Sequence, residues 1–126
     1  MTKRDYNMTI ADLKGKTINS FTGGKEGDDY VEFKTDDGYR FHFVHHQDCC
    51  ESVSINDIVG DLNDLIGFPI VLAEESCNGD PNADESGTWT FYRFATIKGY
   101  VNIRWYGTSN GYYSESVDLD VWNDNA

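Results

Sequence analysis

Seven side chains that can bind a metal or act as a nucleophile lie within residues 42–51. Imidazole, thiolate and carboxylate groups are the usual ligands of first-row transition metals, and a mixture of His and Cys favours Zn²⁺. If residues 42–50 continued as one strand, alternation would direct four of these side chains to the same face. The four candidate ligands are His42, His46, Asp48 and Cys50.

The spacing within this cluster gives only a weak metal signal. The chain has no C-x-x-C pair and no H-x-x-x-H pair on a predicted helix. We therefore interpret the cluster as structural, with Cys49 or Cys50 buried as a small apolar residue and the histidines at a strand end. The metal site stays as the alternative, and we expect no bound metal or cofactor.

Catalysis by either adjacent cysteine is a third interpretation of the cluster. The neighbouring carboxylates of Asp48 and Glu51 would raise the pKa of a thiol, which disfavours a thiolate nucleophile. Glu74 and Glu75 are adjacent in a predicted strand, so they point to opposite sides and cannot flank one scissile bond. The chain also lacks a glycine-rich phosphate loop and a G-x-S-x-G motif. We expect a non-catalytic protein.

Negative charge is concentrated in the middle of the chain. The net charge is -12, and residues 41–92 contain ten Asp and Glu but no Lys or Arg. This acidity favours cationic partners and disfavours nucleic acid or phosphorylated ligands. The cations after residue 92, which are Arg93, Lys98 and Arg104, are too few for a nucleic-acid footprint. An anionic nucleotide would require Arg93 and Arg104 to converge in one pocket.

Length and composition predict one domain spanning residues 1–126. A chain of 126 residues with 39% hydrophobic residues can build one core, and a second would be hard to form. The first residues lack the apolar segment of a signal peptide, and no run approaches a membrane span, so we expect a cytoplasmic protein. Three cysteines, two of them adjacent, make a poor disulfide framework, and we expect reduced thiols.

Residues 29–35 and 39–46 form the clearest predicted pair of strands. Both segments alternate, and Asp36-Asp37-Gly38 provides a hairpin turn. Further strands are expected over residues 16–21, 68–75, 88–97, 100–107 and 112–122, with turns at Lys98-Gly99 and Asn110-Gly111. The side chains of the first hairpin expected on the buried face are Val31, Phe33, Phe41 and Phe43.

Residues 56–66 are predicted to form the main helix, and residues 9–15 a short helical turn or a loop. Asn56 is a suitable N-cap, and Gly67 followed by Pro69 ends the segment. Five apolar residues fall at helical spacing, namely Ile58, Val59, Leu62, Leu65 and Ile66. Together the elements predict an α+β fold, in which a curved antiparallel sheet of about seven strands carries the main helix on one face.

Exposed acids and tyrosines are the candidate contacts for a partner. On the predicted helix, three aspartates at i, i+4 and i+7 would form one acidic stripe, for which a solvated face is the alternative interpretation. Tyrosines near the Asn110-Gly111 turn could anchor an interface. The predicted contact residues are Asp57, Asp61, Asp64, Glu74, Glu75, Tyr106 and Tyr112, with Asp48 and Glu51 flanking them.

Three segments carry a resemblance to a known group of proteins. They are "LKGKTI", "FHFVHHQDCCESVSINDIVGDL" and "FYRFATIKGYVNIRWYGTSNGYYSES". The chain resembles small bacteriophage and prophage proteins of uncharacterised function. The resemblance implies a phage-borne accessory protein that acts in the host cytoplasm, and it assigns no catalytic residue.

These observations predict a non-catalytic acidic binding protein. Its partner would be a host protein with a basic surface, such as a nucleic-acid-binding or defence component, which the acids would inhibit or engage by imitating phosphates. We expect no direct contact with nucleic acid or membrane. The alternatives are a small metalloprotein, possibly an enzyme, built on the His/Asp/Cys cluster and a protein that sequesters a small ligand through its tyrosines.

Overall fold

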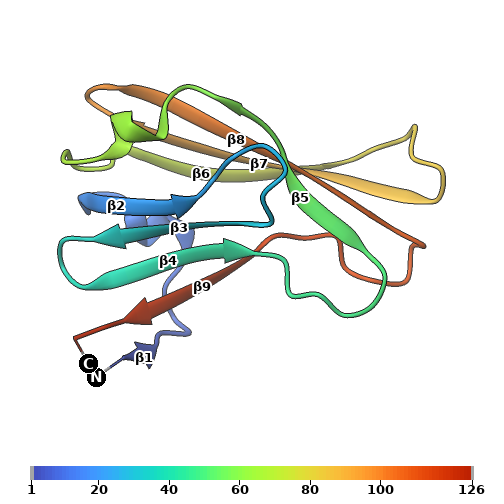
Figure 1. Ribbon diagram of the computed structural model, residues 1–126, viewed down its shortest axis with the longest axis horizontal. Coiled ribbons are helices and arrows are strands. Elements are labelled where there is room, and N and C mark those ends of the chain that lie inside the picture. The colour runs from blue at the N-terminus through green and yellow to red at the C-terminus, as the bar shows by residue number, and fades with distance from the viewer. Residues whose placement is uncertain (1, 126) are drawn as a thin grey trace.

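Two antiparallel β-sheets face each other in the computed structural model, which describes residues 2–125 (Figure 1). The first sheet has the order β1-β9-β4-β3-β2 and the second has the order β5-β8-β7-β6. Two short 3₁₀ segments, η1 and η2, accompany them. The elements are β1 (Lys3–Arg4), η1 (Ile10–Leu13), β2 (Ile18–Gly23), β3 (Tyr30–Thr35), β4 (Tyr39–Val44), β5 (Ser52–Val59), η2 (Leu62–Leu65), β6 (Leu72–Gly79), β7 (Ser86–Thr96), β8 (Gly99–Ser109) and β9 (Asp118–Asn123).

The two hairpins with the strongest sequence signals are confirmed. β3 pairs with β4 around Asp36-Asp37-Gly38, where Gly38 has φ +92° and so takes the left-handed conformation that the turn requires. β7 pairs with β8 around the predicted Lys98-Gly99 turn. The short helical turn near residue 10 is also present, as η1. All four side chains expected on the buried face of the first hairpin are at most 1% exposed, and they are Val31, Phe33, Phe41 and Phe43.

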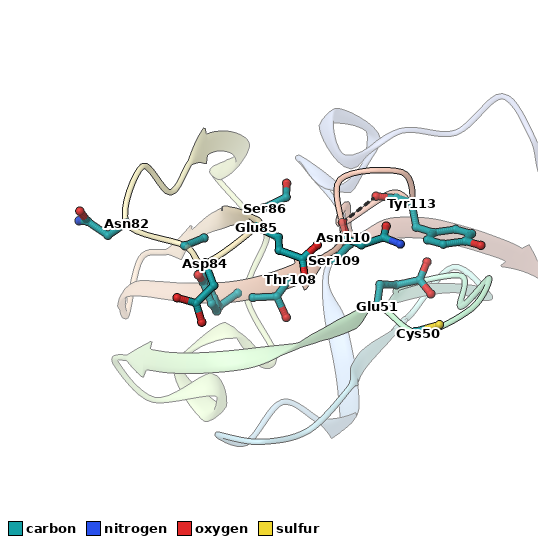
Figure 2. A pocket seen from close by; sticks show the side chains of 12 residues that line it. Cys50, Glu51, Asn82, Asp84, Glu85, Ser86, Thr108, Ser109, Asn110 and Tyr113 are labelled. Atoms are coloured by element: carbon teal, nitrogen blue, oxygen red, sulfur yellow. Dashed lines mark hydrogen bonds between the residues drawn. The ribbon is translucent and has the colours of Figure 1, made fainter.

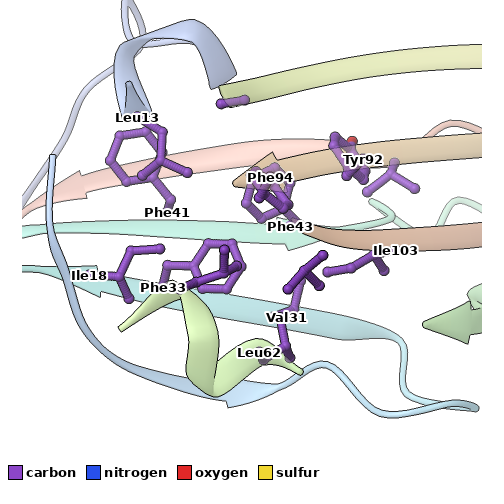
Figure 3. Packing of buried hydrophobic residues seen from close by; sticks show 14 of the residues in the cluster. Leu13, Ile18, Val31, Phe33, Phe41, Phe43, Leu62, Tyr92, Phe94 and Ile103 are labelled. Atoms are coloured by element: carbon purple, nitrogen blue, oxygen red, sulfur yellow. The ribbon is translucent and has the colours of Figure 1, made fainter. Parts of the chain in front are cut away.

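Aromatic side chains from both sheets form the centre of the core (Figure 3). Phe33 of β3 meets Phe94 of β7 edge to face, with ring centroids 5.3 Å apart. Phe43 of β4 meets Tyr92 of β7 at 4.9 Å. Such pairs contribute beyond the apolar area that they bury. Aromatic side chains of β3, β4 and β7 therefore connect the two sheets within the core.

The predicted α+β fold with a main helix at 56–66 is wrong. Residues 52–59 form strand β5, and only residues 62–65 form a helical turn, η2. The cause is a β-bulge in β5 between Ile55 and Asp57, where one extra residue interrupts the alternation of inward and outward side chains opposite β8. As a result, the inward-facing residues Ile55 and Ile58 are three residues apart. This is the spacing expected on one face of a helix, whereas a regular strand would place them two or four residues apart. The fold is instead an antiparallel sandwich of two sheets.

The predicted hairpin at Asn110-Gly111 is also wrong. Residues 110–117 carry the chain from the second sheet to the first, where β9 pairs with β4 and β1. β9 begins only at Asp118, although the sequence predicted a strand from residue 112. Within residues 2–125 the helical segments have four residues each, so none could cross a lipid bilayer.

Candidate functional site: an acidic basin

Three loops meet at one end of the sandwich and line an open cavity of about 540 Å³ (Figure 2). We call this cavity the acidic basin; it is lined by residues 50–51, 82–86 and 108–110, together with Tyr106 and Tyr113. Asp84 and Glu85 lie exposed at its rim, on the loop between β6 and β7. Among the residues that the structure describes, the lining contains no Lys or Arg.

Asp80 and Tyr106 fix the base of the β6–β7 loop. The Tyr106 hydroxyl donates a hydrogen bond of 2.6 Å to Asp80 Oδ2, and the backbone N–H of Asn82 donates to Asp80 Oδ1 at 2.9 Å. The hydrogen bond from Tyr106 is the main reason why the pKa of Asp80 is lowered, and it raises the pKa of Tyr106 in turn. Asp80 therefore stays ionised at neutral pH, next to the rim.

Glu115 adds a buried carboxylate beside the basin. Burial acts to raise its pKa, but hydrogen bonds from the hydroxyls of Ser109 and Thr88 outweigh burial, and the net pKa is lowered. The Thr88 hydroxyl donates at 2.7 Å. Because Ser109 also lines the basin, the charge of Glu115 contributes to the field inside it.

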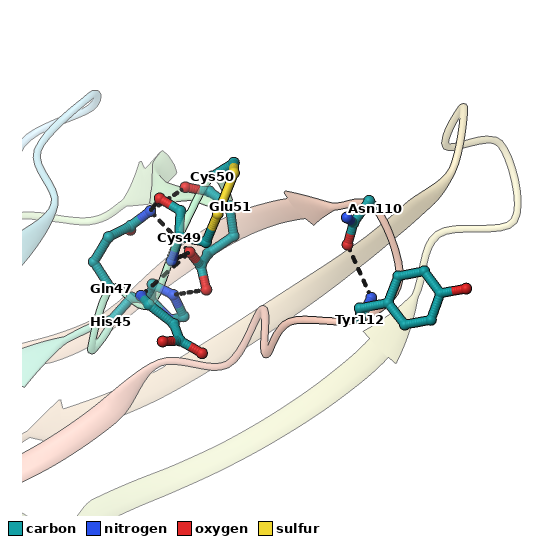
Figure 4. The surroundings of a disulfide bond; sticks show 8 residues. His45, Gln47, Cys49, Cys50, Glu51, Asn110 and Tyr112 are labelled. Atoms are coloured by element: carbon teal, nitrogen blue, oxygen red, sulfur yellow. Dashed lines mark hydrogen bonds and ion pairs between the residues drawn. A yellow bond between two sulfur atoms is a disulfide. The ribbon is translucent and has the colours of Figure 1, made fainter.

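Glu51 organises the loop that forms the opposite wall (Figure 4). Its Oε1 accepts hydrogen bonds from the backbone N–H of Cys49 at 2.7 Å and from Gln47 Nε2 at 2.9 Å. Burial acts to raise the pKa of Glu51, but hydrogen bonds from the backbone N–H groups of Cys49 and of Glu51 itself, and from the His45 side chain, lower it overall. The other oxygen, Oε2, lies 3.4 Å from Nε2 of buried His45, whose Nδ1–H donates to the Ser116 carbonyl at 2.6 Å.

Cys49 and Cys50 are joined by a disulfide in this loop and both are exposed (Figure 4). This corrects two expectations, that the pair is reduced and that one of the two is buried. The loop leaves strand geometry after β4 ends at Val44, so neither side chain turns into the core. Cys77 is a free, exposed thiol on β6.

The four candidate metal ligands are not brought together. Within residues 2–125, no three His, Cys, Asp or Glu side chains are arranged to hold a metal ion. His42 lies 3.4 Å from Glu32 and stacks on Tyr30, whereas His46 contacts Asp120 of β9. Asp48 is exposed in the loop, and Cys50 is in the disulfide.

His46 provides a pH-dependent contact at the end of β4. Its Nε2 lies 2.9 Å from Asp120 Oδ2, and this hydrogen bond is the first cause of the raised pKa of His46. A raised pKa means that the folded state binds the proton more tightly than the unfolded state. The stabilisation is therefore complete below the unfolded value of about 6.5 and is lost as pH rises through the folded value.

Wild-type protein should lose more stability between pH 6 and pH 8.5 than the His46→Gln variant. Because the side chain is 56% exposed, the difference should not exceed about 1 kcal/mol, or roughly 3–5 °C in melting temperature. Thermal unfolding at a series of pH values measures it. Parallel curves for the two proteins would contradict the assignment.

The predicted acidic contact residues are dispersed over the second sheet and the segment that follows β5. Asp57 lies on β5, 4.0 Å from Arg104, and Asp61 caps η2, which also contains Asp64. Glu74 and Glu75 lie on edge strand β6, where their register partners are Arg93 and Tyr92. Desolvation raises the pKa of Glu75. The three aspartates form no helical stripe, because Asp57 belongs to strand β5, Asp61 is the N-cap of η2 and Asp64 lies within η2.

The two predicted tyrosines lie near the acidic basin. Tyr106 lines it, and Tyr112 is 89% exposed on the neighbouring loop. Sequence reasoning counted Asp80, Asp84 and Glu85 in the acidic block of residues 41–92, but it did not name them or Glu115 as contact residues. A signal was available, since Asn78-Gly79-Asp80-Pro81 and Asn110-Gly111 are both turn sequences rich in polar neighbours. That the two loops lie side by side follows only from the pairing of β7 with β8, which sets Ser86 opposite Ser109.

Comparisons with known proteins give a family and no assigned activity. The profile of a domain of unknown function (DUF7448) matches residues 11–119. No curated protein and no solved structure matches the chain. The matched range includes the whole acidic basin, all four strands of the second sheet, and β2, β3 and β4 of the first sheet. The chain therefore belongs to the family described as a domain of unknown function (DUF7448).

Proposed function

We propose that this protein is a non-catalytic binding protein that docks its acidic basin onto a basic protein surface. The observation that carries the proposal is a cavity of about 540 Å³ with rim and wall carboxylates and, within residues 2–125, no cation among its lining residues. This volume falls in the range of small-ligand pockets, so it can admit a Lys or Arg side chain.

The carboxylates around the basin are fixed before a partner arrives. Asp80 is held by Tyr106, Glu115 by Ser109 and Thr88, and Glu51 by backbone N–H groups. These charges are fixed near the cavity and add to the field that attracts a cationic partner. Tyr106 and Tyr113 add aromatic surface beside the acids, and such residues are enriched where interfaces bind most strongly.

The resemblance to bacteriophage and prophage proteins supports a more specific form of the proposal. The partner is then a host protein in the host cytoplasm whose basic surface normally meets nucleic acid or serves defence. Carboxylates spread over loops at one end of the sandwich can occupy the positions of phosphates on such a surface. The basin replaces the helical stripe as the contact region, with Tyr106 at its wall and Tyr112 nearby.

Removing the two rim charges should weaken binding of a basic probe. We expect Asp84→Asn/Glu85→Gln to bind a fluorescent Arg-rich peptide about tenfold more weakly than wild type at 50 mM salt, because two rim ion pairs are lost. Fluorescence anisotropy gives the Kd. Wild-type affinity should also fall between 50 and 200 mM salt, since exposed charges are screened over about 10 Å at 0.1 M.

A matched control separates the basin from general acidity. Glu26→Gln/Asp29→Asn removes the same two charge types from exposed positions in the β2–β3 loop, outside the basin. This control should bind nearly as wild type. Equal losses in the two double variants would show that net charge alone attracts the peptide and would overturn the proposal.

A further inference from the structure

The outward face of the second sheet combines aromatic rings with guanidinium groups. Strand register places the side chains of this face in rows across β6, β7, β8 and β5. In one row, Phe91 lies beside Arg104, and in the next row Arg93 lies beside Asn102. Trp89 and Tyr106 occupy the row on the other side of Phe91, with ring centroids 4.2 Å apart.

A cavity of about 450 Å³ opens on this face, and Phe91, Arg93 and Arg104 all line it. It shares no lining residue with the acidic basin. From the sequence, binding of an anionic nucleotide required Arg93 and Arg104 to converge in one pocket. Both residues line this cavity. Arg93 follows Phe91 by two residues on the same face of β7, and Arg104 is the register partner of Phe91 on β8.

Arg104 is held in place before any ligand binds. Its Nε and one terminal nitrogen donate to Asn56 Oδ1 at 3.0 and 2.6 Å, and its guanidinium lies 4.9 Å from the centre of the Trp89 ring. Asp57 lies at 4.0 Å and Glu74 is the register partner of Arg93. These carboxylates compete with an anionic ligand for the two guanidinium groups, but both guanidinium groups still belong to residues that line one cavity.

Asn102 contributes a polar group to the same cavity. Its Oδ1 is shielded from solvent and accepts no hydrogen bond within the described part of the chain. A shielded acceptor without a donor is costly, so a ligand N–H or O–H that reaches it after a rotation of the amide gains affinity. Ser76 and Asn78 of β6 add further hydrogen-bonding groups to the wall.

We infer that this cavity binds a small planar aromatic anion, whose ring stacks on Phe91 while its anionic group bridges Arg93 and Arg104. Guanidinium groups bind phosphate and carboxylate through paired donors, and aromatic faces bind planar rings. The nucleoside monophosphates and the aromatic carboxylates share this chemistry. The volume of the cavity suits a ligand of that size. A neutral sugar could also lie on an aromatic ring, but it has no anionic group to pair with the two guanidinium groups.

Calorimetric titration with defined probes tests the inference. The probes are the four common nucleoside monophosphates, benzoate, adenosine, inorganic phosphate and a neutral oligosaccharide. At least one aromatic anion should bind in the micromolar to low millimolar range, and adenosine and inorganic phosphate should each bind at least tenfold more weakly. A preference between the phosphates and benzoate identifies the anionic group. Absence of binding by every aromatic anion, or equal binding of adenosine and its monophosphate, would overturn the inference.

Variants locate the binding in the cavity. Arg93→Gln and Arg104→Gln should each lower the affinity for the aromatic anion at least tenfold. Glu74→Gln should raise this affinity several-fold, because it removes a competing negative charge. Lys98→Gln is the control, because Lys98 lies over Phe68 and outside the cavity. Melting temperatures verify that each variant folds. Oligosaccharide binding that survives both Arg variants, or an equal loss in Lys98→Gln, would refute the site.

Discussion

The Phe33→Ala variant is expected to lose about 3–5 kcal/mol of unfolding free energy, as large-to-small changes at buried aromatics do. Phe33 is 0% exposed and lies against Phe43 in its own sheet and Phe94 in the opposite sheet. Removing its ring leaves a cavity between the sheets where both would have to move to close it. Urea unfolding followed by tryptophan fluorescence measures the loss.

Two further variants make this test decisive. Domains of this size have total stabilities of about 5–15 kcal/mol, so Phe33→Ala could unfold the protein outright. Phe33→Leu keeps most of the volume and should cost less than about 1.5 kcal/mol. Ile97→Ala, at a side chain that is 83% exposed, should change stability by no more than about 0.5 kcal/mol. A loss below 1 kcal/mol in Phe33→Ala would contradict the packing of the two sheets.

The Gly60→Ala variant should lose roughly 2–5 kcal/mol. Gly60 joins β5 to η2 with φ +100°, a conformation that costs other residues about 1–2 kcal/mol. An added methyl group would also overlap the backbone carbonyl oxygen of Tyr100, which cannot move without disturbing the β7–β8 hairpin. Overpacking of this kind costs about 1–3 kcal/mol. Urea unfolding gives both contributions together.

Gly67→Ala separates these two contributions. Gly67 has φ +86°, and no atom lies within 4 Å of the position of an added methyl group. It should therefore show the cost of backbone strain alone, about 1–2 kcal/mol. If Gly60→Ala and Gly67→Ala lost equal stability, the close approach of residue 60 to Tyr100 would be wrong.

The β3–β4 hairpin, which alternates strictly, could be predicted from the sequence, and strand β5, which has a bulge, could not. The β3–β4 hairpin has one polar turn and an uninterrupted period of two, so its buried face was assigned correctly. In β5 the bulge between Ile55 and Asp57 breaks this period. Helical spacing and an N-cap residue then predicted a helix, although Val53, Ile55, Ile58 and Val59 are β-branched residues that favour strands.

The candidate sites depend on contacts between distant segments, which sequence patterns do not specify. The excess of acids in residues 41–92 was evident, but it did not show that the β6–β7 loop lies beside the loop after β8. Asn110-Gly111 predicted a hairpin between neighbouring strands, whereas residues 110–117 connect the two sheets. The convergence of Arg93 and Arg104 likewise follows from the register of β7 and β8.

The central claim is that the acidic basin is the surface that meets a basic protein. Titration of ¹⁵N-labelled protein with the Arg-rich peptide, followed by NMR chemical shifts, tests it most directly. The account predicts that the largest shift changes fall in residues 80–86, 108–113 and 48–51, and that they weaken at 200 mM salt. Largest changes on the outward face of the second sheet, around Arg93 and Asn102, or changes spread evenly over all exposed acids, would contradict it.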